Sequence, residues 1–172
     1  TLFDGGPGSH DELGSFATFL FSHNTQVAIL TFALGIFVTL PSFVLTFYNG
    51  LILGTFWKVF AEKGLGYEVT GWLSIHGVTE MAAFCIACAG GAQLGLAVLL
   101  PGQLSRREAL RQRGRDAVKL MILAGLMLVC AAILEGFFRQ TVQSTEARLA
   151  IGWGIGLGWV LWLGLSGRET QT

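Results

Sequence analysis

Long hydrophobic stretches alternate with short polar ones along most of the chain. Apolar runs occupy residues 27–57, 69–100, 117–138 and 149–166, and the charged residues gather in the intervals between them. About 20 consecutive apolar residues, each rising about 1.5 Å in a helix, cross the hydrocarbon core of a bilayer. The pattern therefore predicts an all-α, polytopic membrane protein with four to five hydrophobic helices.

The first apolar run does not fit a single span. Residues 27–57 are too many for one helix across the membrane and too few for two. Pro41 lies near the middle of the run, and Asn49 and Gly50 form a turn signal. Two interpretations stay open. Either one span near residues 27–47 is continued by an interfacial helix, or a broken, re-entrant helix doubles back between Pro41 and Gly50.

The segment before the first run has a different character. Ser9 and Glu12 have the spacing of a helix capping box, and an aromatic face follows them, which is typical of a helix at the headgroup level. We therefore divide the chain into an interfacial N-terminal segment (1–26), a transmembrane bundle (27–166) and a tail (167–172).

The charges are few and segregated. The sequence is 52% hydrophobic and only 13% charged, whereas soluble domains carry about 25% charged residues. Five arginines fall in the interval 103–116: Arg106, Arg107, Arg111, Arg113 and Arg115. Short loops rich in arginine stay on the cytoplasmic side, which sets the orientation of the chain. Binding of anionic lipid or an acidic partner is the alternative role of this loop. Nucleic-acid binding is not supported, because the arginines form one short loop at a membrane.

A few ionisable residues lie inside the apolar runs, where their cost makes them candidates for function. His76 and Glu80 are four residues apart and share one helix face. Glu135 lies near the end of the next run. On the predicted orientation, all three lie toward the outer leaflet.

A weak internal echo extends this group. Residues 21–24 (Phe-Ser-His-Asn) resemble residues 74–77 (Ser-Ile-His-Gly). If these are two copies of one element, the helices that follow them are parallel. His23 and Asn24 would then join the same polar cluster. Asn49 is a further polar residue within an apolar run.

The polar residues allow three interpretations. In a structural role, His76 pairs with Glu80, and Glu135 pairs with Arg139, four residues on. A metal site would start from His76 and Glu80, the only cofactor site that the sequence suggests. His23 or Glu135 would complete it. A proton or ion path would run along the same side chains. The sequence shows no serine–histidine–acid arrangement and no phosphate-binding loop, which favours a non-catalytic protein.

Small residues recur at four-residue spacing, which lets helices approach closely in lipid. These pairs are Gly50 and Gly54, Gly91 and Gly95, Gly152 and Gly156, and Gly154 and Gly158. They predict packing within the bundle or, on the last helix, an interface with a partner or a second copy. Cys85 and Cys88 have redox-pair spacing, but packing is favoured because no second pair completes a zinc site.

Several of these positions together resemble the stage II sporulation protein M family of bacterial and archaeal membrane proteins. They are Ser22-His23-Asn24, Gly35, Asn49-Gly50, Gly54, His76-Gly77, Glu80, Gly90, Gly95 and Glu135-Gly136-Phe137. The His-Gly-x-x-Glu element with the upstream Asn-Gly pair is the most specific part, and the resemblance covers roughly residues 20–140.

The resemblance implies a multi-pass protein of the bacterial cytoplasmic membrane, with a further hydrophobic helix upstream. The family's namesake acts with peptidoglycan-cutting partners during engulfment. We therefore expect a non-catalytic membrane scaffold or partner subunit in envelope processes. Its partners would be the lipid bilayer and other membrane proteins or copies of itself. An ion or small-molecule transporter and an intramembrane metal-dependent enzyme are the alternatives.

Overall fold

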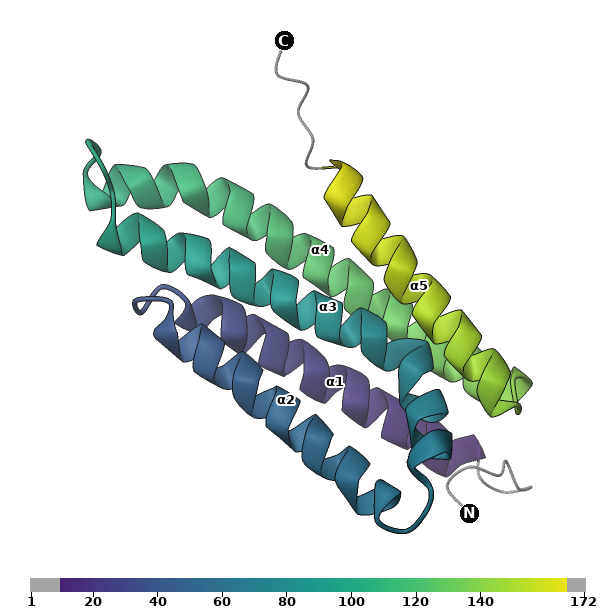
Figure 1. Ribbon diagram of the computed structural model, residues 1–172. Coiled ribbons are helices and arrows are strands. Elements are labelled where there is room, and N and C mark those ends of the chain that lie inside the picture. The colour runs from purple at the N-terminus through teal and green to yellow at the C-terminus, as the bar shows by residue number, and fades with distance from the viewer. Residues whose placement is uncertain (1–9, 167–172) are drawn as a thin grey trace.

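The computed structural model describes residues 10–166 as a bundle of five helices (Figure 1). They are α1 (His10–Leu34), α2 (Leu40–Ala61), α3 (Gly66–Leu99), α4 (Arg106–Thr141) and α5 (Thr145–Ser166). Residues 1–9 and 167–172, and so the predicted tail, lie outside this description. So do the side chains of residues 10–20, 137, 139 and 140.

Four of the helices are long and apolar enough to cross a membrane: α2, α3, α5 and, over Arg106–Gly136, α4. The prediction of an all-α, polytopic membrane fold is confirmed.

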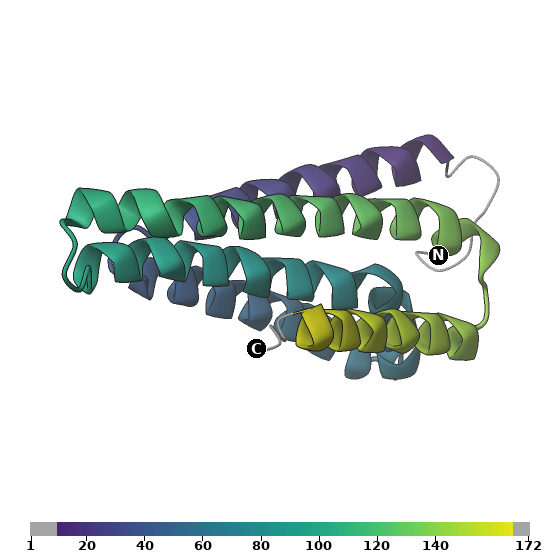
Figure 2. The ribbon, with the colours of Figure 1, turned by 90° about the horizontal axis from the view of Figure 1, so that it is seen from above.

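Consecutive helices run antiparallel, so α1, α3 and α5 point one way and α2 and α4 the other (Figures 1 and 2). Viewed from above, α1 and α4 form one layer and α2, α3 and α5 the other (Figure 2). The α1–α2 and α3–α4 connections lie at the same end of the bundle (Figure 1). We call this the arginine end, because the arginines of α4 follow the second connection. The α2–α3 and α4–α5 connections lie at the opposite end.

The chain reverses direction between Leu34 and Leu40, earlier than the region between Pro41 and Gly50 that the sequence predicts. Pro41 stands in the first turn of α2, where its fixed φ suits a helix start and its missing N–H costs nothing. Asn49 and Gly50 lie inside α2. The first apolar run is therefore the end of α1 followed by most of α2.

The predicted boundary at residue 26 does not coincide with a break in the helical structure. It falls inside α1, which is one continuous helix from His10 to Leu34. Residues 10–26, which the sequence predicts to lie at the membrane interface, therefore continue without a break into the rest of α1. The reversal after α1 nevertheless makes α1 and α3 parallel, as the echo between residues 21–24 and 74–77 suggests (Figure 1).

Contact between helices holds the reversal in place. Val38 and Thr39 have φ values of 65° and 64°, in the left-handed region that β-branched residues rarely adopt. A Cβ on Gly95 would lie 2.6 Å from the backbone nitrogen of Thr39. The turn thus fits against α3 only because residue 95 has no side chain.

Helix α3 is the central element and contacts each of the other four helices. The core between α1, α3 and α4 contains many alanines, which let the helices approach closely. Its buried members are Ala28, Ala83, Phe84, Ile86, Ala87, Ala124, Met127 and Leu128. This packing positions the polar residues of the three helices relative to one another.

Candidate functional site

Polar side chains from four helices meet inside the bundle. We call them the polar cluster. Its members are Asn24 (α1), His76 and Glu80 (α3), Glu135 (α4) and Arg148 (α5). His76, Glu135 and Arg148 are almost fully buried, with 4%, 3% and 5% of their surface exposed. Buried ionisable groups within membrane spans are costly, so the bundle must satisfy them.

Glu80 connects two neighbouring helices to α3. Its carboxylate has a side-chain hydrogen bond with Asn24, and it lies close enough to Glu135 for the two charges to interact. The parallel course of α1 and α3 brings Asn24 level with Glu80. The amide is a neutral partner that can donate to a carboxylate.

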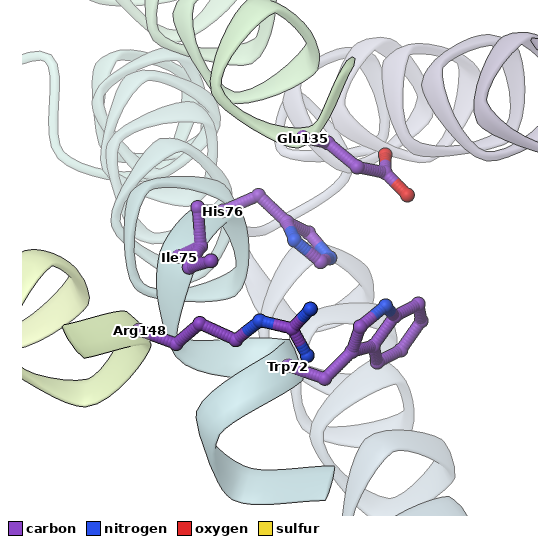
Figure 3. A pocket seen from close by; sticks show the side chains of 5 residues that line it. All are labelled: Trp72, Ile75, His76, Glu135 and Arg148. Atoms are coloured by element: carbon purple, nitrogen blue, oxygen red, sulfur yellow. The ribbon is translucent and has the colours of Figure 1, made fainter. Parts of the chain in front are cut away.

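His76 lies one helical turn from Glu80 and faces a small pocket (Figure 3). Trp72, Ile75, His76, Glu135 and Arg148 line this pocket. The ring of His76 meets that of Trp72 edge-on, with 5.4 Å between centroids and an interplanar angle of 81°. The cavity volume of the pocket is about 10 Å³, roughly the space that one water molecule needs. In this conformation the pocket is too small for a typical substrate.

Arg148 is the cluster member that the sequence analysis missed. It stands in the first turn of α5, and its Nε donates a 2.8 Å hydrogen bond to the carbonyl of Val142, the C-cap residue of α4. A cation is favourable at a helix C-terminus, where carbonyl groups lack partners. Arg148 was missed because the sequence assigns it to the polar loop 139–148. Its place next to the last apolar run was the available signal that it could turn inward.

The predicted partner of Glu135 was Arg139, whose side chain lies outside the described part of the structure. Figure 3 shows Arg148 and His76 pointing into the pocket that Glu135 also lines. The side chains that share the pocket with Glu135 thus come from α3 and α5.

Further hydrogen bonds fix α5 against α3. Trp159 Nε1 donates to Thr79 Oγ1 at 3.1 Å, and the hydroxyl of Tyr67 donates to Glu146 Oε1 at 3.2 Å. These two contacts lie on either side of the pocket along α3. They keep Arg148 in register with His76.

The region that carries this cluster matches a known protein family. The family model described as stage II sporulation protein M matches residues 4–139. The chain belongs to the stage II sporulation protein M family. No curated protein and no solved structure matches it. Within this SpoIIM-family chain, the match covers every member of the polar cluster except Arg148, which comes from α5. With four helices able to cross a membrane, this SpoIIM-family chain is an integral, multi-pass membrane protein.

Two polar residues that the sequence analysis singled out, His23 and Asn49, are not members of the polar cluster. His23 is exposed on α1, although its neighbour Asn24 is half-buried and turned toward Glu80. Asn49 lies on α2, where its Nδ2 donates to the carbonyl of Leu45 at 2.9 Å. Asn49 thus satisfies its own helix.

The predicted metal site gains no further support from the geometry. Among the described residues, no group of three histidine, cysteine, aspartate or glutamate side chains is placed to hold a metal ion. Cys88 is buried, and Cys85, like Cys130, is exposed and free. Cys85 and Cys88 therefore do not form a disulfide.

Two glycine pairs lie at close helix contacts of this SpoIIM-family bundle. A Cβ on Gly91 would lie 2.8 Å from the carbonyl oxygen of Phe32, so α3 touches the backbone of α1 there. Gly95 meets Thr39 in the α1–α2 turn, as described above. On α5, a Cβ on Gly156 would lie 2.6 Å from Val78.

Gly152 is the tightest point between α5 and α3. Any Cβ there would overlap the backbone of Ser74. By contrast, no described residue lies within 4 Å of where a Cβ would be on Gly50 and Gly54 of α2, and the same holds for Gly154 and Gly158 on α5. The small-residue faces of α2 and of one side of α5 are therefore uncovered.

The arginines surround the first turns of α4. Arg106, Arg107, Arg111, Arg113 and Arg115 are all exposed. Ser105 caps the helix, because its Oγ accepts from the backbone N–H of Glu108 at 3.2 Å. Farther along, Lys119 donates to Asp116 at 2.8 Å. The arginine end thus presents a dense positive charge on a rigid helix.

Proposed function

We propose that this protein is a non-catalytic subunit of the bacterial cytoplasmic membrane that binds other membrane proteins in envelope processes. Membership of the stage II sporulation protein M family supports this role, since the family's namesake works with peptidoglycan-cutting partners. The observation that carries the proposal is the exposure of α2. None of its most apolar segment is buried by the residues that the structure describes, compared with 50% for α3.

The uncovered face of α2 suits a helix partner. Its exposed large apolar residues include Phe43, Val44, Phe47, Tyr48, Leu51 and Ile52. Gly50 and Gly54 leave a shallow notch among them, and small residues four apart permit close approach of a second helix. A membrane subunit that recruits partners needs such a face, which the described part of the chain leaves uncovered.

The polar cluster supports the same role, because it fixes how the helices of the bundle are arranged. It links α1, α3, α4 and α5 through side chains that meet in the interior, around a pocket smaller than typical substrate sites. Buried polar groups can fix the register of packed helices. A fixed register keeps the outer faces of the bundle in a constant arrangement for a partner.

The orientation follows from the arginines. The arginine end faces the cytoplasm in this proposal, because short basic loops are retained there. The exposed guanidinium groups of α4 then lie near anionic headgroups of the inner leaflet. His76, Glu135 and Arg148, toward the other end of the bundle, then lie nearer the outer leaflet, whereas Glu80 lies near the middle of α3.

The proposal is tested by the composition of the native assembly. The tagged protein is extracted from its own membrane in a mild detergent, and the intact assemblies are weighed by native mass spectrometry. We expect a complex that contains at least one other membrane protein in a fixed ratio. If the protein is recovered only as itself, across several detergents and after chemical cross-linking in the membrane, the proposal fails.

A second candidate function, a proton path, is favoured by one observation. Glu80 and Glu135 interact electrostatically inside the bundle, and His76 lies one turn from Glu80. Chains of glutamate and histidine are typical of proton relays in membranes. Proteoliposomes loaded with a pH-sensitive dye test this candidate: proton flux that Glu80→Gln abolishes would favour it over the scaffold.

A further inference from the structure

Helix α1 packs along the membrane-spanning helix α3, and its outer face carries polar side chains. Gln26 is exposed, and its side chain has no hydrogen bond within the described part of the chain. His23, one turn earlier, is exposed as well. The amide of Gln26, which has no such bond, would be strongly unfavourable against hydrocarbon. Something other than lipid should therefore cover this face.

Contacts with α3 give the depth of Gln26. Asn24 bonds with Glu80, and the ring of Phe32 would lie 3.0 Å from a Cβ on Gly90. At the other end of this stretch, Gly71 contacts the start of α5, at Thr145. Glu80 lies midway between these two glycines on α3. Gln26, half a turn beyond Asn24, is therefore level with the middle of the membrane-spanning helix α3.

The exposed residues form a regular stripe, which we call the α1 seam. Its members are His23, Gln26, Leu30, Ala33 and Phe37, all of which are exposed. Their spacing alternates between three and four residues, the pattern of a and d positions in a coiled coil. The seam extends past the end of α1 to Phe37 in the turn. A second helix with the same period can pack along it.

The chemistry of the seam identifies the partner. A glutamine amide both donates and accepts hydrogen bonds, and so does a neutral imidazole. Across a two-fold axis, Gln26 would meet its own copy, and the two amides would pair reciprocally. Two copies in one membrane share one orientation, so such an axis runs along the membrane normal and the two seams are parallel. Ala33 on the same stripe would let the backbones come close.

We infer that the α1 seam is the contact of a parallel homodimer, with Gln26 as the polar pair that sets its register. Polar residues at a single layer of a coiled coil specify register in this way. The inference goes beyond the proposed function, because partner proteins would bind α2, on a different helix, and the dimer needs no such partner.

The test is disulfide cross-linking in native membranes. The three native cysteines are first replaced by alanine, and single cysteines are then placed in the full chain. Leu30→Cys and Ala33→Cys lie on the seam. Val44→Cys on α2 and Val160→Cys on α5 are controls that are at least as exposed, at 59% and 68% against 49% for Leu30. After mild oxidation, we expect the seam variants to give at least ten-fold more dimer than the controls.

A second measurement examines the polar pair. Gln26→Leu, combined with Ala33→Cys, is expected to lower the cross-linked fraction at least five-fold, while the melting temperature of the protein in detergent stays unchanged. Equal cross-linking at all four cysteine positions would overturn the inference. So would seam cross-links to a different polypeptide, or a dimer fraction that Gln26→Leu leaves unchanged. Whether partner proteins bind α2 does not enter this test.

Discussion

Gly35 and Gly91 touch backbone to backbone, at the point where the α1–α2 turn meets α3. A Cβ on Gly35 would overlap the main chain of Gly91, and one on Gly91 would lie 3.0 Å from the carbonyl oxygen of Thr31. The hydroxyl of Ser42, at the start of α2, donates to that same carbonyl. The contact therefore joins α1, α2 and α3 through main-chain atoms that cannot move aside individually.

This contact predicts that Gly91→Ala destabilises the bundle. The added methyl group would force α1 away from α3, and overpacking of this kind costs about 1–3 kcal/mol. The free energy of unfolding in mixed micelles, measured by titration with a denaturing detergent, gives the change. Gly125→Ala is the matched control, because nothing lies within 4 Å of its Cβ position on α4. Equal stability of the two variants would show that the helices are not in this contact.

The hydrogen bond between Asn24 and Glu80 leads to a second prediction. Asn24→Leu removes the partner of a carboxylate inside the bundle, and we expect a loss of about 1–3 kcal/mol in unfolding free energy. Glu80→Gln keeps a group that can bond with Asn24 and should cost less. Ser22→Ala, on the exposed side of α1, is the control. If Asn24→Leu is as stable as Ser22→Ala, the bond does not hold α1 to α3.

The pocket predicts coupling between Arg148 and Glu135. Arg148→Met should lower the unfolding free energy by about 2 kcal/mol, because the Val142 carbonyl loses its bond with a charged donor. Residues that share a buried polar site are not independent. The double variant Arg148→Met, Glu135→Gln should therefore cost at least about 0.5 kcal/mol less than the sum of the two single variants. If the losses in unfolding free energy are additive, Arg148 and Glu135 do not interact.

An exposed arginine serves as the control for this cycle. Arg106→Met lies at the arginine end, outside the bundle interior, and surface substitutions usually change stability by less than about 0.5 kcal/mol. A loss at Arg106 as large as that at Arg148 would mean that the charge change itself, rather than the buried contact, lowers stability.

The sequence predicted the helical membrane fold and the convergence of His76, Glu80 and Glu135, because both follow from local periodicity and from the cost of charge in lipid. It did not locate the first reversal. That turn consists of apolar and β-branched residues and is held by Gly91 and Gly95, which lie far along the chain. A turn stabilised by tertiary contact leaves no local signal.

Arg148 escaped prediction for a related reason. In the sequence it ends a polar loop, and contacts of α5 with α3, among them that of Gly152 with Ser74, set α5 so that the guanidinium points inward. Asn24, by contrast, was found because its neighbourhood echoes that of His76. When the packing of two helices that are distant in sequence fixes a residue's position, the pattern within one segment cannot predict that position.

The basic loop predicts which connections face the cytoplasm. In Ser105→Cys, a membrane-impermeant maleimide should label the protein in inside-out vesicles but not in intact cells. In Lys63→Cys, on the connection at the opposite end, the labelling should be reversed, because short loops rich in arginine remain cytoplasmic. Labelling of Ser105→Cys from outside intact cells would invert the orientation, and with it the depth assigned to the polar cluster.

The central claim, that the uncovered face of α2 binds other membrane proteins, is tested most directly by Gly54→Ile. Within residues 10–166, nothing lies within 4 Å of the Cβ position at Gly54, so the bundle itself should tolerate the change. Gly164→Ile, equally open near the end of α5, is the matched control. Native mass spectrometry of assemblies extracted from the membrane should show the partner with the wild type and Gly164→Ile. Its occupancy should fall at least five-fold with Gly54→Ile. Identical partner occupancy in all three proteins, or no partner in any of them, would contradict the account.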